Sequence, residues 1–297
     1  MSVERFTQIE IPVRSYDLAL TLQSGQAFRW QQVRDGWEGV IGSRWVRLEP
    51  SPGNIGALAA GASQDWSWLT GYLQTDVDLE PILASFPSDE PMRASVAAGR
   101  GLRLLRQDPW ECLASFILSS CKRIVQIEQI VALLCARFGK PVTVPPGHAE
   151  VFAFPSPDRL AGCSEAELRA CKMGWRAVGL GETSRRVASG EVNLGRLRFC
   201  SMQEARRELM RLPGVGPKVA NCVLLFAYGC QEAFPVDVWV RKALRHLYFR
   251  GRRSSPAQLR RFAETHFGPN AGYAQQYLFH YMRTLGKLEA PGLKNRR

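Results

Sequence analysis

The sequence lacks any long run of apolar residues. Its longest stretch of apolar residues and glycine extends from Cys222 to Cys230, far short of the ~18 residues that a membrane-spanning helix requires. Residues 1–6 show neither the apolar core nor the small-residue cleavage site of a secretory signal. We therefore expect a protein that does not span a membrane and that works in a reducing, intracellular compartment.

The chain also lacks the cysteine and histidine spacings that bind metals. Its eight cysteines include no C-x₂-C pair, and its four histidines include no H-x₃₋₅-H pair. Zinc fingers and four-cysteine iron–sulfur loops need such spacings. We therefore assign no metal site and expect most of the cysteines to be buried.

Acidic residues are few compared with basic ones. The 297 residues include 39 Lys and Arg against 27 Asp and Glu, which gives a formal net charge of +12. Such a charge favours polyanionic partners such as nucleic acid, although membrane surfaces and acidic proteins also attract basic proteins. The apolar fraction of 45% is that of an ordinary globular protein, and the length suggests about two domains.

The N-terminal part has the alternation of apolar and polar residues that is typical of β-strands. Between residues 6 and 50 this alternation is broken by turn signals, and the Ser-Pro-Gly-Asn sequence at 51–54 is expected to close the strand segment. We predict a small antiparallel sheet within an N-terminal domain of residues 1–88.

The remainder of the chain, 89–297, shows helical periodicity. Apolar residues recur at intervals of three and four, which predicts helices over 90–105 and 110–137. The tail, 286–297, has no such periodicity. The predicted fold class is therefore α+β, with a small antiparallel β-sheet domain followed by a mostly α-helical region.

Residues 201–229 have the pattern of two helices joined by a tight hairpin. Ser201 and Glu204 form a capping box for the first helix, and Pro217 suits the first turn of the second. Glycines in the turn allow the close approach of a partner, and amides at the start of the second helix provide a phosphate site. The candidate phosphate-binding residues are Gly214, Val215 and Gly216. A plain turn between two helices remains the alternative.

Two ionisable residues in this region indicate that it belongs to a catalytic site. Lys218 lies in the first turn of the second helix, where the helix dipole disfavours an ammonium, and Cys222 lies on the same face. Asp237, in the loop 230–240, precedes an amphipathic helix and has a simple alternative role as its N-cap. Together, a lysine and a carboxylate of this kind are suited to amine-nucleophile chemistry at a sugar carbon.

The stretch LPGVGPKVANCV followed by PVDVW resembles the helix-hairpin-helix glycosylases with a Gly/Pro…Asp loop. Three further segments make the chain similar to the 8-oxoguanine DNA glycosylases in particular: SGQAFRW at 24–30, GLRLLRQDPWECL at 101–113 running into FILSS at 116–120, and GYAQ at 272–275. The resemblance extends over essentially the whole chain.

This resemblance implies a base-excision-repair enzyme with two activities. Lys218 would attack the anomeric carbon of the deoxyribose, displace the damaged base and form a Schiff base, after which β-elimination nicks the strand. Asp237 would stay ionised and stabilise the oxocarbenium-like transition state.

The resemblance also implies a pocket for a base that has been rotated out of the duplex. Phe279 and Cys222 match the two walls that stack on the base, and Gln275 matches the residue that recognises its Watson–Crick edge. Gly25 matches the glycine whose carbonyl accepts the N7 hydrogen that 8-oxoguanine has and guanine lacks. By their types alone, Phe279 would be a core residue and Gln275 a solvated helix position.

The segment expected to contact the base opposite the lesion departs from the family. Cys121, Lys122 and Arg123 stand where familiar members carry asparagines that fill the gap left by the base, and Gln126 stands in place of an arginine that recognises the orphaned cytosine. Arg176 matches a second cytosine-reading arginine. We therefore expect weaker dependence on the opposite base.

Further expectations concern partners and cofactors. Trp239 stands where familiar members of the family carry a histidine that contacts phosphate, and as a DNA-binding candidate its indole N–H can donate one hydrogen bond but carries no charge. Hairpins of the family also bind a monovalent cation through backbone carbonyls, and no other cofactor is expected. The expected partner is damaged double-stranded DNA, bound by a monomer in the cytoplasm, associated with the nucleoid if the source is bacterial.

Two alternatives to this function stay open. The same scaffold excises other damaged bases in related branches, but Lys218 argues against the mechanism for alkylated purines, and the missing cysteines argue against the iron–sulfur branch for oxidised pyrimidines. A non-catalytic DNA-binding module is the second alternative, and the presence of both Lys218 and Asp237 argues against it.

Overall fold

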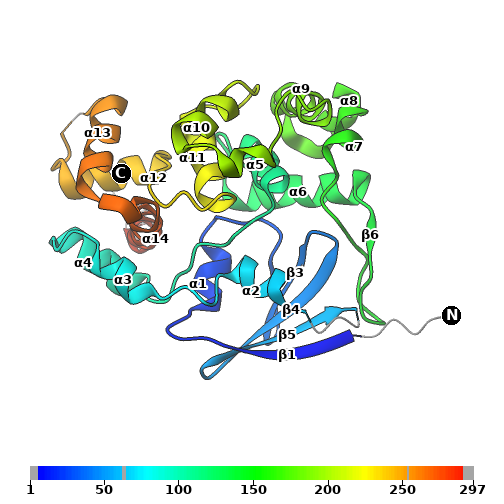
Figure 1. Ribbon diagram of the computed structural model, residues 1–297, viewed down its shortest axis with the longest axis horizontal. Helices are drawn as coiled ribbons and strands as arrows, with labels where there is room; N and C mark the ends of the chain where they lie inside the picture. The colour runs from blue at the N-terminus through cyan, green and yellow to red at the C-terminus, as the bar shows by residue number, and fades with distance from the viewer. Residues whose placement is uncertain (1–5, 62–64, 253, 290–297) are drawn as a thin grey trace, which may run out of the picture.

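The computed structural model describes residues 6–61, 65–252 and 254–289. A five-stranded antiparallel sheet lies on one side of the molecule, and most of the helices are stacked above it (Figure 1). The strand order is β1-β5-β4-β3-β2. The strands are β1 (Phe6–Pro12), β2 (Gln31–Val33), β3 (Gly36–Ile41), β4 (Arg44–Ser51) and β5 (Asn54–Ala60).

The sheet extends further along the chain than the sequence indicated. The turn at 51–54 does not close the strand segment, because Ser51 pairs with Asn54 in a hairpin that leads directly into β5. Gly53, with φ +74°, makes this turn possible. Sequence patterns missed β5 because it consists mainly of small residues, yet it pairs with both β1 and β4. The expected antiparallel sheet is confirmed.

One short helix lies between β1 and β2, and three more follow the sheet before the helical region. They are α1 (Leu18–Gln23), α2 (Ser67–Leu73), α3 (Leu79–Ala84) and α4 (Glu90–Ala98). The prediction of one helix over 90–105 was wrong beyond Gly99. Residues after Gly101 run without helix because their polar groups bind the N-terminal domain: the Leu105 N–H donates to Gln26 Oε1 at 2.8 Å, and Arg103 Nη2 donates to the Arg14 carbonyl at 2.9 Å.

A break also interrupts the helix predicted over 110–137. The chain forms α5 (Pro109–Leu118) and α6 (Ile124–Phe138), separated by a turn in which Cys121 adopts φ +55°. Helical periodicity continues across the turn because both helices turn an apolar face to the same core. The side chains of this turn reach the candidate site.

The predicted hairpin is confirmed. Ser201 and Glu204 form the capping box of α10 (Met202–Met210), and Pro217 begins α11 (Pro217–Phe226). Between α6 and α10 lie β6 (Pro141–Val142), β7 (Val151–Phe152), α7 (Pro157–Ala161), α8 (Glu165–Leu168), η1 (Arg169–Met173), α9 (Arg176–Ala188) and η2 (Arg196–Phe199).

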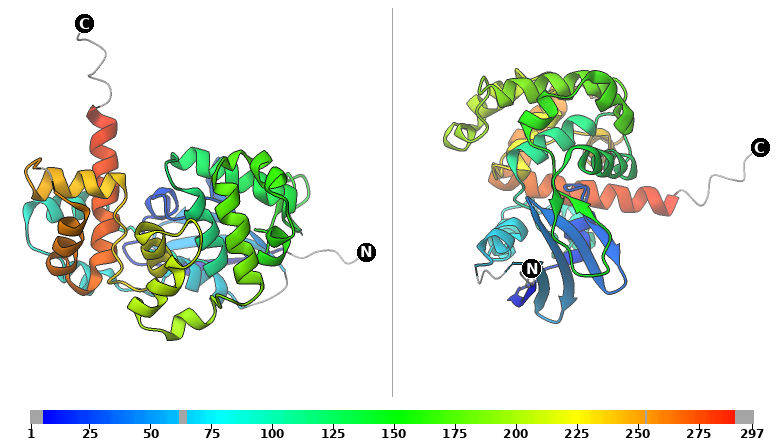
Figure 2. Two further views of the ribbon diagram at one scale, coloured as in Figure 1. Left: turned by 90° about the horizontal axis from the view of Figure 1, so that it is seen from above. Right: turned by 90° about the vertical axis from the view of Figure 1, so that its right-hand side faces the viewer.

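The C-terminal helices form a group of their own beside α3 and α4 (Figure 1). They are α12 (Val238–Ala243), η3 (Leu244–Tyr248), α13 (Pro256–His266), η4 (Gly268–Asn270) and α14 (Ala271–Glu289). Helix α14 projects from the body toward the C-terminus (Figure 2). The tail expected to lack periodicity begins inside this helix, and residues 290–297 lie outside the described part of the chain.

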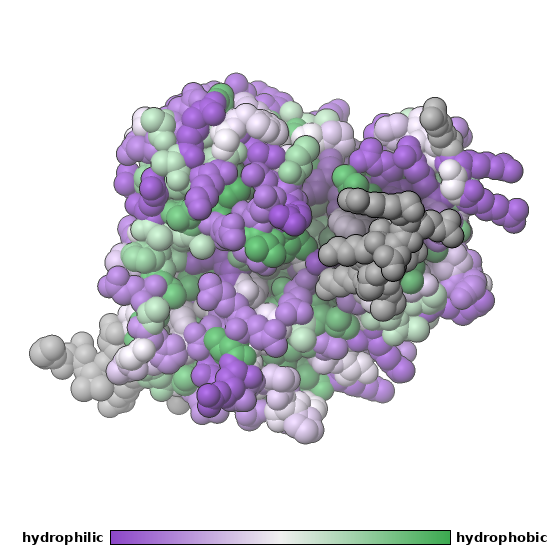
Figure 3. All heavy atoms as spheres, turned by 180° about the vertical axis from the view of Figure 1, so that it is seen from behind, coloured by the Kyte–Doolittle hydropathy of each residue, from purple (hydrophilic) through white to green (hydrophobic). Residues whose placement is uncertain are grey.

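The described residues were compared with the features that a membrane span or a metal site needs. None of their helices is both long and apolar enough to cross a bilayer, and none of their His, Cys, Asp and Glu side chains gather in threes as a metal site requires. Five cysteines are buried. The face shown in Figure 3 is mostly hydrophilic, with smaller apolar patches.

Candidate active site

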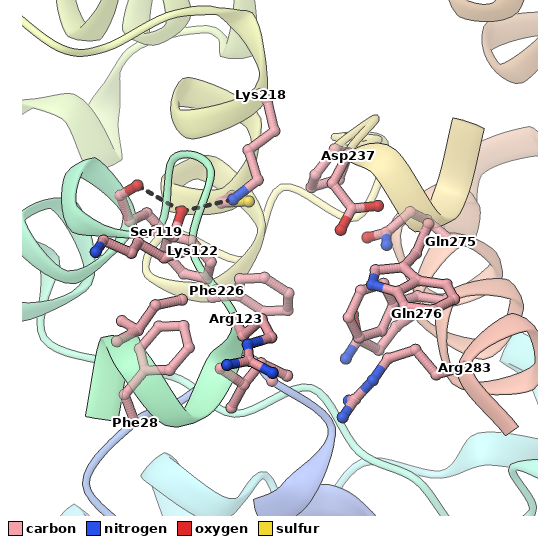
Figure 4. A pocket seen from close by; sticks show the side chains of 18 of the residues that line it. Phe28, Ser119, Lys122, Arg123, Lys218, Phe226, Asp237, Gln275, Gln276 and Arg283 are labelled. Atoms are coloured by element: carbon pink, nitrogen blue, oxygen red, sulfur yellow. Dashed lines mark hydrogen bonds between the residues drawn. The ribbon is translucent and has the colours of Figure 1, made fainter. Parts of the chain in front are cut away.

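A cavity of about 330 Å³ lies between α5, α6 and α11 on one side and α14 on the other (Figure 4). It brings together every catalytic and base-contacting residue predicted from the sequence: Gly25, Lys218, Cys222, Asp237, Gln275 and Phe279. Lys122, Arg123 and Trp239 also line it. These residues come from segments as far apart in sequence as 25 and 279, so the cavity is a product of the tertiary fold.

Lys218 lies in the first turn of α11 because Gly216 caps this helix and Pro217 begins it. Its Nζ donates to Ser119 Oγ at 2.9 Å and lies 4.7 Å from the centroid of the Phe116 ring. Ser119 Oγ donates its own proton to the Phe116 carbonyl, so its lone pairs face the lysine. Within the described residues Lys218 forms no ion pair with a carboxylate, which leaves its amine available for reaction.

Asp237 caps the N-terminus of α12, as expected. Its Oδ1 accepts from the Val240 N–H at 2.7 Å. Burial raises the pKa of the Asp237 carboxyl, while the hydrogen bond from Val240 and the charge of Lys218 act in the opposite direction. Capping and cavity lining are therefore compatible roles of one carboxylate.

Cys222 lies one turn beyond Lys218 on α11 and is buried. Burial raises the pKa of its thiol to about 11, against the opposing effect of the Lys218 charge. The thiol is therefore neutral at physiological pH and forms a compact wall of the cavity, not a nucleophile.

The loop that carries Gly25 is fixed on both sides by glutamine side chains. Gln276 Nε2 donates to the Ser24 carbonyl at 3.0 Å, and Gln107 Nε2 donates to the Gln26 carbonyl at 2.6 Å. Within the described part of the chain, the Gly25 carbonyl itself accepts no hydrogen bond. A free acceptor is thus held in place at the edge of the cavity.

Replacing Gly25 by alanine should impair the base release that the resemblance implies more than it impairs stability. Gly25 has φ +76°, and a Cβ there would lie 2.7 Å from Ile124 Cδ1 and 3.5 Å from Phe279 Cε1. The backbone strain costs roughly 1–2 kcal/mol, and the displaced neighbours distort the cavity. We expect an excision rate at least ~10-fold lower, since a displaced Gly25 carbonyl no longer holds the base in the reactive position.

Gly53→Ala is a matched control, because Gly53 has φ +74° with no atom near the added Cβ. It should lower the melting temperature to a similar extent and leave excision unchanged. Equal excision by the two variants would show that Gly25 has no role in the site.

Gln275 and Phe279 lie one turn apart on α14 and face the cavity. Gln275 is only 4% exposed, yet its Oε1 has no hydrogen-bond partner in the described structure. An unpaired buried amide oxygen is costly and is typical of a ligand-binding position. Phe279 offers an aromatic face next to this acceptor, as stacking on a base requires.

The turn between α5 and α6 carries the residues expected to contact DNA. Cys121 and Arg123 are exposed, and Lys122 is partly exposed. Gln126 accepts from the Arg123 N–H at 3.0 Å through its Oε1, so its side chain caps α6.

Arg176 is placed differently from its expected role. It is 4% exposed, and it donates to the carbonyls of Ser120 and, at 3.4 Å, Met173. Its neighbour Trp175 is 61% exposed and lies over the Arg176 guanidinium with 4.5 Å between the guanidinium carbon and the ring. These bonds occupy two of the five N–H donors of Arg176 and hold its side chain against the protein.

The hairpin turn presents two of its three predicted residues to solvent. Gly214, with φ +82°, and Gly216 are exposed. Val215 is buried, and its N–H donates to the Leu212 carbonyl at 3.1 Å, so its amide is not free to bind phosphate. Gly214 and Gly216 stay the candidates.

Sequence reasoning missed the polar residues that hold the site together. Ser119 was noted only as part of a motif, and Gln26, Gln107 and Gln276 were assigned no role. The available signal was local: Gln276 directly follows Gln275, and Gln26 directly follows Gly25. Nothing in the pattern indicated which distant backbone groups they bind.

Most of the chain matches the models of two known families. Residues 8–113 match the 8-oxoguanine DNA glycosylase N-terminal domain, and residues 114–269 match the HhH-GPD superfamily base excision DNA repair proteins. A probable N-glycosylase/DNA lyase of Methanothermobacter thermautotrophicus is 32% identical over 95% of this chain and 98% of its own. The N-glycosylase/DNA lyase of Arabidopsis thaliana is 34% identical over 88% and 76%.

Solved structures give the same result. The 8-oxoguanine glycosylase/lyase of Clostridium acetobutylicum, in complex with double-stranded DNA containing cytosine opposite 8-oxoG, superposes with a TM-score of 0.87 at 30% identity, covering 96% of this chain and all of the other. The two family matches together include the lining of the candidate cavity except the wall that α14 contributes. The chain therefore belongs to the 8-oxoguanine DNA glycosylase family of helix-hairpin-helix base excision repair enzymes, the N-glycosylase/DNA lyases.

Proposed function

We propose that this enzyme excises 8-oxoguanine from duplex DNA and then cleaves the strand, with Lys218 as nucleophile. The observation that carries the proposal is the shared cavity, in which an amine without a carboxylate partner lies near Asp237 and an unpaired amide oxygen of Gln275. We further propose that it acts as a monomer in the cytoplasm, with DNA as its partner and a monovalent cation at the hairpin carbonyls.

In the proposed reaction, the unprotonated Lys218 amine attacks C1′ of the deoxyribose. The C1′–N9 bond breaks, and its electron pair leaves with the base, which takes up a proton. The C1′–O4′ bond then breaks, the remaining amine proton is transferred to O4′, and a Schiff base forms between Nζ and C1′. Removal of a C2′ proton then expels the 3′ phosphate by β-elimination. Asp237 stabilises the positive charge that develops on the sugar.

The proposed base specificity rests on two acceptors. Guanine-type bases present N1–H and N2–H donors on their Watson–Crick edge, which suits the free Oε1 of Gln275. The Gly25 carbonyl accepts the N7 hydrogen of 8-oxoguanine, whereas N7 of guanine is an acceptor. Two acceptors facing each other are left unpaired, which penalises the undamaged base.

Single-turnover base release tests the proposed function. The enzyme is incubated with duplexes that carry 8-oxoguanine, guanine or an alkylated purine, and free base is measured. Release of 8-oxoguanine with little release from the other duplexes is expected. Preferential release of the alkylated purine would place the enzyme in another lesion class, and binding without release would leave a DNA-binding module.

We also predict that excision depends weakly on the opposite base. Gln126 caps its own helix and Arg176 binds backbone carbonyls, so both positions expected to recognise cytosine are engaged within the protein. Excision rates for 8-oxoguanine opposite C, A, G and T should agree within about 10-fold, because a hydrogen bond between neutral groups contributes only about 0.5–1.5 kcal/mol. A preference for C of 100-fold or more would contradict the prediction.

A further inference from the structure

Arg283 is a cation of the cavity with no polar partner. It lies on α14 one turn beyond Phe279, with its guanidinium carbon 5.3 Å from the centroid of the Phe279 ring. Within the described residues it forms neither a hydrogen bond nor an ion pair. Figure 4 shows its side chain extending from α14 across the cavity in the direction of Arg123, which lies on the opposite wall.

The environment of Arg283 favours an anionic partner. Burial lowers the pKa of its guanidinium, and the charges of Asp237 and Glu128 only partly oppose that effect. Neither carboxylate is within ion-pair distance of Arg283 in the described structure. The guanidinium has five N–H donors, and Arg283 is only partly buried, so these donors can reach a ligand in the cavity. An anionic ligand would accept hydrogen bonds from these donors.

Among the described residues that line the cavity, Arg283 is the only cation on α14, and its neighbour Trp239 on α12 carries no charge. Among the described lining residues, the cations are Lys122 and Arg123 at the α5–α6 turn, Lys218 on α11, and Arg283 on α14. The Trp239 indole packs on the bare backbone of Gly286, where a Cβ would lie 3.1 Å from its Cζ3 atom. Gly286 lies three residues beyond Arg283, hence on the same helix face.

We propose that Arg283 binds a backbone phosphate of the extrahelical nucleotide and so holds this nucleotide against Phe279. The inference rests on the proposed function, which brings a nucleotide and its two flanking phosphates to this cavity. A guanidinium donates two parallel hydrogen bonds to a phosphate, which fixes direction as well as charge. Arg283 is therefore a substrate-binding residue that positions the base, and it takes no part in bond breaking.

The test pairs Arg283 variants with neutral phosphates in the DNA. Each phosphate flanking the lesion is replaced in turn by a methylphosphonate, and duplex affinity is measured with an uncleavable 2′-fluoro analogue of the lesion nucleotide. Arg283→Met keeps the length of the side chain and removes the charge. Arg137→Met is the matched control, because Arg137 is exposed at the end of α6 and does not line the cavity.

For the wild type and for Arg137→Met, neutralising one particular phosphate should lower the affinity about 10-fold, the order expected for a charged hydrogen bond. The affinity of Arg283→Met for unmodified DNA should be about 10-fold lower than that of the wild type. Neutralising that phosphate should not lower the affinity of this variant any further. The affinity of Arg283→Lys should fall less, since lysine keeps the positive charge. The proposal would be overturned if the loss of affinity caused by Arg283→Met and the loss caused by neutralising a phosphate were additive at every phosphate. If Arg283→Met fails to fold, the same criterion applies to Arg283→Lys.

The rate of base release separates this inference from the proposed function. For Arg283→Met, the enzyme concentration that gives the half-maximal single-turnover rate should rise about 10-fold, because the charged hydrogen bond to the phosphate is lost. The maximal rate should change less. A wild type that binds the analogue but releases no base would disprove the proposed function. The phosphate coupling would still be measurable in the binding experiment.

Discussion

Changing Lys218 to glutamine is expected to lower the rate of 8-oxoguanine release by at least ~10³-fold, since the variant loses the nucleophile on which both steps depend. Glutamine retains an N–H that can donate to Ser119 Oγ, which accepts from Lys218 Nζ at 2.9 Å in the wild type. The cavity therefore keeps its shape, and duplex affinity should change by no more than a few-fold.

The measurement is single-turnover base release under saturating enzyme, with Lys242→Gln as the matched control. Lys242 lies near the same cavity, 5.9 Å from the Trp239 ring, but does not line it. The control should release base at the wild-type rate. A Lys218→Gln variant within 10-fold of the wild type would mean that water, and not this amine, attacks the sugar.

Asp237→Asn should separate catalysis from stability. Loss of a charge that stabilises the transition state is expected to lower base release by about 10²–10³-fold. Asparagine caps helices as well as aspartate does, so α12 should stay intact. Because burial raises the pKa of Asp237, ionisation of this carboxyl costs folding free energy once the pH exceeds its folded pKa. The neutral variant should therefore be at least as stable as the wild type near pH 7.

Thermal unfolding and pH–rate profiles check both parts of this prediction. Base release by the wild type should decline as the pH falls through the raised pKa of Asp237, and Asp237→Asn should lack this decline. Lower stability of the variant near pH 7, together with an unchanged rate of release, would show that Asp237 serves only as a helix cap.

The catalytic segment was predictable because its signals are local. The capping box of Ser201, the placement of Pro217 and the cap formed by Asp237 each depend on residues within one helical turn. Their positions in sequence therefore carry over directly to the structure. The resemblance then placed Gly25 and Gln275 in the same pocket, which spacing alone did not indicate.

What the sequence did not show depends on contacts between distant segments. Residues after Gly99 leave the helix since Gln26 and the carbonyls of the N-terminal domain offer them hydrogen bonds. The inward position of Arg176 is set by the Ser120 carbonyl, 56 residues earlier in the chain. Such pairings follow from the assembled fold and leave no periodic pattern in the sequence.

Borohydride trapping on a duplex that carries one 8-oxoguanine tests the central claim most directly. Reduction of the Schiff base joins the enzyme to the DNA permanently, and digestion followed by mass spectrometry identifies the modified residue. The account predicts an adduct only with damaged DNA, located on the α11 peptide at Lys218. Base release without an adduct, or an adduct on another lysine, would contradict it.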